Sequence, residues 1–137
     1  MWLVYALLAA FFAALTSILA KIGVENVNSN LATAIRTVVV LLMSWAVVWA
    51  TGKQQDLANI GSKSLWFLLL SGVATGLSWL CYYRALQIGE ASKVISLDKL
   101  SLVIGVVLAV VILKETLTIK TIVGGVLITL GALVLVF

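Results

Sequence analysis

Five apolar stretches, each close to the length of a membrane-spanning helix, hold most of this sequence, and nearly all charged residues lie between them. A hydrocarbon core of about 30 Å is crossed by about 20 helical residues, because each residue adds about 1.5 Å. The stretches cover residues 2–20, 31–50, 64–83, 94–113 and 121–137. The sequence therefore predicts an all-α integral membrane protein with five transmembrane helices.

Composition leaves no room for a separate soluble part. Hydrophobic residues make up 64% of the chain and charged residues only 10%, which is too little polar surface to coat a soluble globule. We therefore expect residues 1–137 to form a single transmembrane domain in contact with a lipid bilayer.

Several classes of function are disfavoured by what the chain contains. The Lys and Arg residues are scattered singly, with no basic run to follow a phosphate backbone, so we expect no nucleic-acid partner. Histidine is absent and Cys81 is the single cysteine, so we expect no metal site and no disulfide within the chain. No nucleophile elbow, phosphate-binding loop or intramembrane pair of carboxylates is present. We predict that the protein is not an enzyme and needs no cofactor.

The positive charges are balanced between the two membrane faces. Five crossings place Lys53, Lys63, Lys114 and Lys120 on the face of the N-terminus, and Lys21, Arg84 and Lys93 on the other. Such a balance gives no orientation by the positive-inside rule. It is typical of dual topology, in which copies insert both ways and pair antiparallel. A single orientation set by a partner or by the first helix is the alternative.

Small residues mark the surfaces where helices can approach closely in lipid, where there is no hydrophobic drive for association. Gly72 and Gly76 lie four residues apart in the third stretch, and Gly124 and Gly131 lie one heptad apart in the fifth. The fifth stretch is terminal and its apolar run is uncharged, so Gly124 and Gly131 are the predicted dimer interface. Ordinary packing within the chain is the alternative.

Three ionisable residues lie inside predicted spans, where charge is costly and marks candidate functional sites. Arg36 lies in the second stretch, and Asp98 and Lys99 lie in the fourth, at similar depths from the same face. An Arg36–Asp98 pair, with Lys99 facing water or a ligand, would leave a positively charged cavity wall. Snorkelling to the headgroups with a purely structural ion pair is the alternative.

Further candidates accompany these charges. Ser101 shares a helical face with Asp98 at a spacing of three residues and points the same way. Four residues at the end of the third stretch could line a substrate portal, or could be aromatic belt residues beside a snorkelling arginine. These are Trp79, Tyr82, Tyr83 and Arg84.

Several motifs, in a fixed order, resemble the EamA-type domain of the drug/metabolite transporter superfamily. In that domain a Tyr-rich helix end, a turn with Ala-Leu, Gly and Ala-Ser, a Lys-Glu turn and a Gly-rich last helix follow one another. The matching segments are Ala32–Arg36, Tyr82–Ser92, Leu97–Ser101, Leu113–Glu115 and Gly124–Gly131. Many members of the superfamily have ten helices in two inverted five-helix domains, whereas this chain resembles the half-size form.

The resemblance implies exchange of small metabolites across the cytoplasmic (inner) membrane, at a site between two domains. If the inverted-repeat architecture applies, the second repeat is a second copy of the chain. Two departures stand out. Lys99 occupies a place where many relatives have proline or an apolar residue, and the first stretch lacks the mid-membrane glutamate with which related multidrug exporters bind cations.

Our leading hypothesis is a secondary-active transporter of a small polar metabolite that works by alternating access as a homodimer, most simply antiparallel. The embedded charges, Arg36 and Lys99 against Asp98, favour an anionic or zwitterionic solute. The alternatives are a non-transporting membrane subunit or scaffold and a drug or cation exporter. A channel is disfavoured because no polar filter motif is present.

Overall fold

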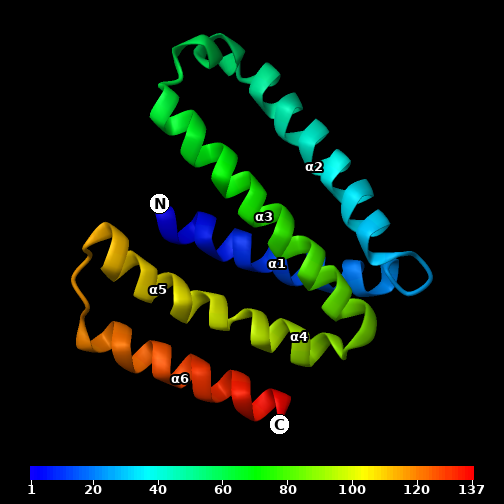
Figure 1. Ribbon diagram of the computed structural model, residues 1–137, viewed down its shortest axis with the longest axis vertical. Helices are drawn as coiled ribbons and strands as arrows, with labels where there is room; N and C mark the ends of the chain where they lie inside the picture. The colour runs from blue at the N-terminus through cyan, green and yellow to red at the C-terminus, as the bar shows by residue number, and fades with distance from the viewer. The chain divides into compact units, whose positions relative to one another are not determined.

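The computed structural model describes residues 1–137, which form helices and no strands (Figure 1). The elements are α1 (Trp2–Gly23), α2 (Ser29–Ala50), the 3₁₀ helix η1 (Lys53–Asn59), α3 (Ser62–Ile88), α4 (Ala91–Asp98), α5 (Leu100–Leu113) and α6 (Ile119–Val136). With α4 and α5 counted as one span over Ala91–Leu113, five helices are long and apolar enough to cross a membrane. The predicted all-α fold with five spans is confirmed.

Two spans differ most from the sequence prediction. Helix α3 continues beyond Tyr83 to Ile88, because the segment after Tyr83 contains helix-forming residues that hydropathy alone does not register. The fourth span is interrupted at Lys99, where the Leu102 N–H bonds to the Lys99 carbonyl, three residues back. The Ser101 hydroxyl donates to the Asp98 carbonyl at 2.6 Å. A polar side chain, and not proline, accompanies this local tightening of the helix.

Contacts within the chain define two compact units. The α2–α3 unit comprises Ala20–Gln87, and the α4–α6 unit comprises Met1–Leu19 with Ile88–Phe137. Helix α1 is continuous and passes from one unit into the other at Ala20. The prediction of one domain over residues 1–137 stays a prediction.

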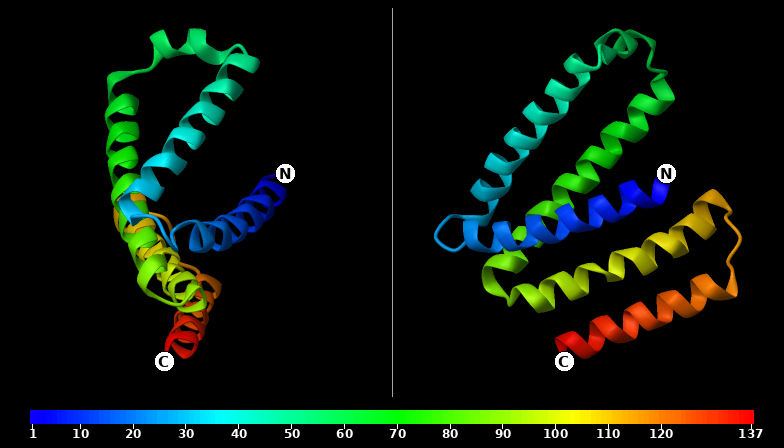
Figure 2. Two further views of the ribbon diagram at one scale, coloured as in Figure 1. Left: turned by 90° about the vertical axis from the view of Figure 1, so that its right-hand side faces the viewer. Right: turned by 180° about the vertical axis from the view of Figure 1, so that it is seen from behind.

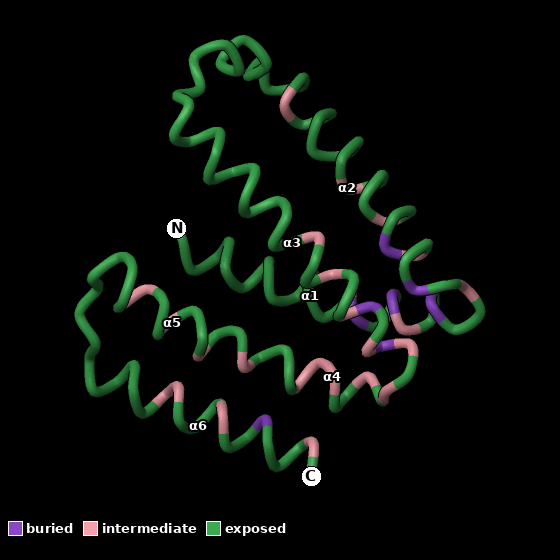
Figure 3. The backbone as a smooth tube through the Cα atoms, in the orientation of Figure 1, coloured by how far each residue is buried: buried purple, intermediate pink, exposed green.

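In the α2–α3 unit, two long helices run antiparallel and are joined by η1 (Figures 1 and 2). Asn28 caps α2, since its side-chain oxygen accepts from the backbone N–H of Asn30 and Leu31. Gly52 follows α2 with φ of 68°, a left-handed conformation that glycine adopts without strain. The buried residues of this unit gather at the end opposite η1 (Figure 3).

In the α4–α6 unit, α6 packs along both α4 and α5 (Figure 2). Lys114 ends α5 in a left-handed conformation with φ of 56°. Thr118 caps α6 by accepting from the Thr121 N–H at 3.2 Å. Ala132, only 5% exposed, is the most buried residue of α6. Most other side chains on these helices are apolar and exposed, as lipid-facing surfaces require.

Candidate functional site

A groove with a volume of about 490 Å³ lies between α2 and α3. Its walls come from one face of each helix, at spacings of three, four and seven residues. The α2–α3 groove, as we call it, is lined by Thr37, Val40, Leu41, Ser44, Trp45, Val48, Leu68, Ser71, Gly72, Thr75, Gly76 and Trp79. On each helix the first and last lining residues are eleven positions apart, so the groove extends about 16 Å along the helix axes.

The hydroxyl groups in this groove are largely satisfied by their own helices. Thr37 donates to the Thr33 carbonyl at 2.7 Å, and Ser44 donates to the Val40 carbonyl at 2.7 Å. Thr75 does the same to the Ser71 carbonyl at 2.9 Å. Each hydroxyl therefore keeps only acceptor capacity towards the groove, and the walls behave as mainly apolar surface.

Arg36 lies beside one end of the groove and contacts two aromatic rings of α3. Its guanidinium carbon is 4.1 Å from the centroid of the Trp79 ring and 5.4 Å from that of Tyr83. These are cation–π distances, which stabilise a partly desolvated arginine by about 0.5–2 kcal/mol. Arg36 makes no hydrogen bond and no ion pair. It lies about 10 Å along α2 from Ser29, so a positive charge is held inside the span without an acidic partner.

A hydrogen-bonded clamp holds the end of α3 against the connection between α1 and α2. Lys21 Nζ donates to the Leu86 carbonyl at 2.7 Å. The Gln87 amide donates to the carbonyls of Val24, at 3.1 Å, and Val27, at 2.8 Å. Arg84 donates to the Gln87 side-chain oxygen at 2.8 Å. We call these five residues and the Leu86 carbonyl the clamp.

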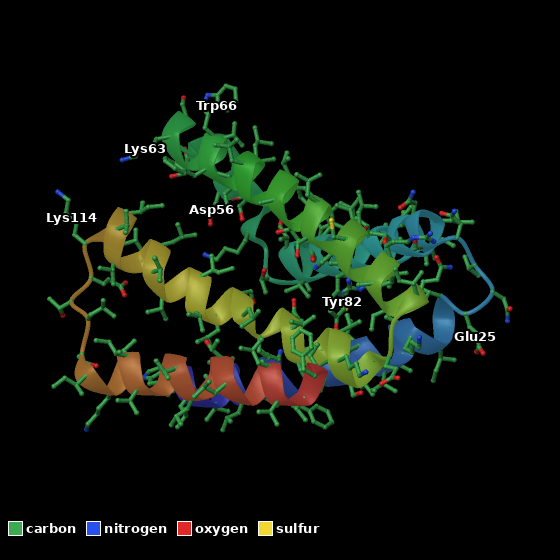
Figure 4. All side chains as sticks on the ribbon, turned by 60° about the horizontal axis from the view of Figure 1, so that its bottom comes forward. Glu25, Asp56, Lys63, Trp66, Tyr82 and Lys114 are labelled. Atoms are coloured by element: carbon green, nitrogen blue, oxygen red, sulfur yellow. The ribbon has the colours of Figure 1, made fainter.

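The clamp lies over the best-packed part of the unit. Leu86 is fully buried, Tyr83 is 4% exposed and Val24 is 1% exposed. Because Tyr83 is fixed in this core, the ring that Arg36 contacts is held in place from the opposite side. By contrast, Glu25 lies on the same connection and points outward, and Lys63 and Trp66 extend from the start of α3 (Figure 4).

Three of the predicted site residues come together, namely Arg36, Trp79 and Tyr83. Arg84 belongs to the clamp, and Tyr82, half-buried, lies on the same helix end. A role of these residues in a substrate portal stays a prediction.

Asp98, Lys99 and Ser101 belong to the α4–α6 unit. Lys99 Nζ lies 3.9 Å from the Asp98 carboxylate, and both side chains are about half exposed. The Ser101 hydroxyl is engaged at the helix interruption by its bond to the Asp98 carbonyl. Since Arg36 belongs to the other unit, the predicted Arg36–Asp98 pair stays a prediction.

The groove and the clamp were not foreseen from the sequence. The stripe of Thr37, Ser44 and Thr75 was detectable as small polar residues at helical spacing. Gly72 and Gly76 were expected to mark close helix contact, yet they line the open groove, and a Cβ on either would meet no atom within 4 Å. The long-range partners of Gln87 have no signal in a single sequence.

A second groove, of about 320 Å³, lies between α5 and α6. The α5–α6 groove is lined by Val103, Val106, Val107, Leu117, Thr121, Ile122, Gly125, Val126, Thr129 and Leu130. Gly124 and Gly131 lie on a different face of α6, and a Cβ on either would meet no atom within 4 Å. Their role as a dimer interface stays a prediction.

Comparison with known proteins agrees with this membrane architecture. An uncharacterised transporter of Sinorhizobium sp., encoded in the cobO 3′ region, is 48% identical over 134 residues, which are 98% of this chain and 95% of that protein. An uncharacterised protein of Methanocaldococcus jannaschii is 33% identical over 103 residues, covering 69% of this chain and 75% of its own length. No solved structure matches the chain.

The family assignment rests on the whole length of the sequence. The EamA-like transporter family matches residues 1–137, which include all five spans, the α2–α3 groove and the interrupted fourth span. The match agrees with the transporter name of the Sinorhizobium relative. Both findings point to a multi-pass membrane transporter rather than an enzyme. This chain belongs to the EamA-like transporter family.

Proposed function

We propose that this protein is a secondary-active transporter of a small anionic or zwitterionic metabolite in the cytoplasmic membrane. It works as a homodimer, with the two copies antiparallel, and moves its substrate by alternating access. The proposal narrows the family assignment by naming the charge of the solute, the number of chains and the mode of transport.

The observation that carries the proposal is the unneutralised Arg36 inside the second span. A charge embedded in the membrane without a counter-charge has a high free-energy cost. A ligand of opposite charge that pairs with it lowers this cost and is therefore bound. Asp98, the acidic residue among the embedded charges, already has Lys99 at 3.9 Å. An organic cation would find no free acid inside the spans, whereas an anion would find Arg36.

A homodimer is supported by the size of the unit that the family match covers. Five spans make one repeat of an inverted-repeat transporter, in which the substrate lies between two repeats. A second copy in the opposite orientation would supply a second repeat. The balanced Lys and Arg residues on the two faces allow both orientations to insert.

Alternating access is supported by the interruption of the fourth span at Lys99. Discontinuous helices recur in secondary transporters, where they form the substrate site around which one repeat rocks against the other. Here the bond from Ser101 to the Asp98 carbonyl, at 2.6 Å, marks the place where the α-helical pattern is broken.

The proposal is tested by transport into proteoliposomes that contain this chain alone. A panel of radiolabelled organic anions, zwitterions and cations is offered from one side, with and without counter-substrate inside. We expect flux of anions or zwitterions, reduced at least tenfold in Arg36→Gln and retained in the control Lys63→Gln at the start of α3. Flux of lipophilic cations alone would support a cation exporter, and absence of flux in folded protein would support a non-transporting subunit.

The antiparallel arrangement needs a separate measurement. In a Cys81→Ser background, Lys63→Cys and Lys93→Cys are labelled in intact cells with an impermeant maleimide. The two positions lie on opposite membrane faces, so dual topology labels a fraction of the copies at both. Labelling at one position only would show a single orientation and would remove the antiparallel dimer from the proposal.

A further inference from the structure

We propose that the substrate is a carboxylate with an apolar body, whose carboxylate binds Arg36 and whose body lies in the α2–α3 groove. This inference rests on the proposed function and deepens it by naming the chemistry of the solute. It departs from the sequence-based expectation of a small polar metabolite, because the groove beside Arg36 is long and mainly apolar.

Arg36 offers the recognition group for the carboxylate. Its ring contacts with Trp79 and Tyr83 leave the N–H donors of the guanidinium without hydrogen-bond partners. A guanidinium presents N–H groups in a planar fork that fits the two oxygens of a carboxylate. The cation–π contacts restrict the side chain, so less conformational entropy is lost when a ligand binds.

The number of free cations favours a monoanion. Within the α2–α3 unit, Lys21 is bonded to the Leu86 carbonyl and Arg84 to Gln87, both in the clamp. Of Lys21, Arg84 and Arg36, only Arg36 has no polar partner, and its guanidinium contacts a ring that lines the groove. A carboxylate is neutralised by a single guanidinium, whereas a phosphate monoester, with nearly two charges, would keep an uncompensated charge in the membrane.

Trp79 connects the charged end with the groove. Its ring lies beneath the Arg36 guanidinium, and Trp79 also lines the groove. Thr37, the residue after Arg36, lines the groove as well. A ligand in contact with this end therefore meets Arg36 and the apolar walls together, and its body extends towards η1 past Val40 and Leu41.

The dimensions of the groove suit a small-molecule ligand. Its volume of about 490 Å³ falls within the range of small-molecule sites, roughly 300–1,000 Å³. The absence of side chains at Gly72 and Gly76 keeps the α3 wall open for a bound molecule.

The test uses ligands that share one apolar body and differ in charge. Purified protein in nanodiscs of phosphatidylcholine is titrated with 4-phenylbutanoate, 4-phenylbutan-1-ol and 4-phenylbutylamine, and with acetate as the head group alone. We expect 4-phenylbutanoate to bind at least tenfold more tightly than each of the other three. Equal binding of the acid and the alcohol, or tighter binding of the amine or acetate, would overturn the proposal.

Variants separate the two halves of the site. Arg36→Gln should weaken 4-phenylbutanoate binding about tenfold or more and leave the alcohol unchanged, while Arg36→Lys should give an intermediate loss because it keeps charge without the fork. Gly76→Leu should weaken the acid and the alcohol alike. Helical circular dichroism and a monodisperse elution profile verify folding. Unchanged acid binding in folded Arg36→Gln would contradict the role of Arg36.

Two further arms identify the source of the ligand and separate this inference from the proposed function. Nanodiscs with phosphatidylglycerol should leave 4-phenylbutanoate binding within threefold, and its complete displacement would assign Arg36 to a lipid head group. In proteoliposomes, transport of small polar anions without binding of apolar carboxylates would sink this inference alone. Specific binding of 4-phenylbutanoate without transport of any solute would sink the proposed function alone.

Discussion

The two grooves of this protein share a helix arrangement but differ in chemistry. Each lies between antiparallel helices, with volumes of about 490 Å³ between α2 and α3 and about 320 Å³ between α5 and α6. The α2–α3 groove contains two indole rings and has Arg36 beside its end, whereas the α5–α6 groove is lined by aliphatic residues, threonines and one glycine. Apolar volume between helices is therefore common to both units, and the Arg36 guanidinium over a groove-lining ring is what distinguishes a candidate substrate site.

The largest expected effect comes from filling the α2–α3 groove. Gly76→Leu places four carbon atoms in the groove, and the backbone tolerates it because a Cβ there meets no atom within 4 Å. We expect transport in proteoliposomes to fall at least fiftyfold, since the ligand loses its space while the helix remains intact.

The matched control is Gly125→Leu, which fills the α5–α6 groove in the same manner. It should leave transport within about twofold of the unsubstituted protein. An equal loss of transport in both variants would show that the two grooves do not differ in function. Both would then be interpreted as packing surfaces.

A smaller effect is expected at the ring that connects Arg36 with the groove. Trp79→Leu removes the cation–π contact at 4.1 Å, worth about 0.5–2 kcal/mol, and should weaken substrate binding about tenfold. Trp79→Phe keeps an aromatic face and should recover most of the affinity. Trp66→Leu, at an exposed indole outside the groove, is the control and should bind normally. Equal affinity in Trp79→Leu and Trp66→Leu would remove Trp79 from the site.

The five spans and the candidate residues Arg36 and Trp79 could be predicted from the sequence, but the contact between these two residues could not. Five spans follow from hydropathy because each helix must satisfy its backbone internally to cross lipid. Arg36 and Trp79 were identified because charge and indole rings are uncommon inside a span. Their contact was not predicted, since it joins residues 43 positions apart in helices whose relative register is set by the turn at η1.

The hydrogen bonds of the clamp could not be predicted from the sequence either. Gln87 reads as an ordinary polar residue after an apolar span, and Lys21 as a loop charge. Both act through hydrogen bonds to backbone carbonyls 60 or more residues away in sequence. Any residue type carries such a carbonyl, so the partners Val24, Val27 and Leu86 leave no trace in composition or spacing.

The third prediction concerns the face of α6 that avoids its groove. At 100° per residue, Gly124 and Gly131 lie together and well away from Gly125 and Thr129, which line the α5–α6 groove. Replacing both Gly124 and Gly131 with leucine should weaken dimerisation about fivefold, the equivalent of about 1 kcal/mol of lost close packing. Crosslinking in nanodiscs as a function of protein-to-lipid ratio measures it, with Gly125→Leu as the control on the same helix. Unchanged dimer content in the double variant would assign this face to lipid or to contacts within the chain.

The smallest effect on transport, with a clear effect on stability, is expected at the clamp. Gln87→Ala removes the donors to Val24 and Val27 and the acceptor for Arg84, leaving partly buried carbonyls unsatisfied. The free energy of unfolding should fall by about 1–3 kcal/mol, measured by denaturation in mixed micelles, while binding at Arg36 changes less than twofold. Gln54→Ala, on exposed η1, is the matched control and should leave stability unchanged. If Gln87→Ala instead abolished substrate binding in folded protein, the clamp would belong to the binding site. The position of the buried Tyr83 ring, which Arg36 contacts, would then depend on the clamp.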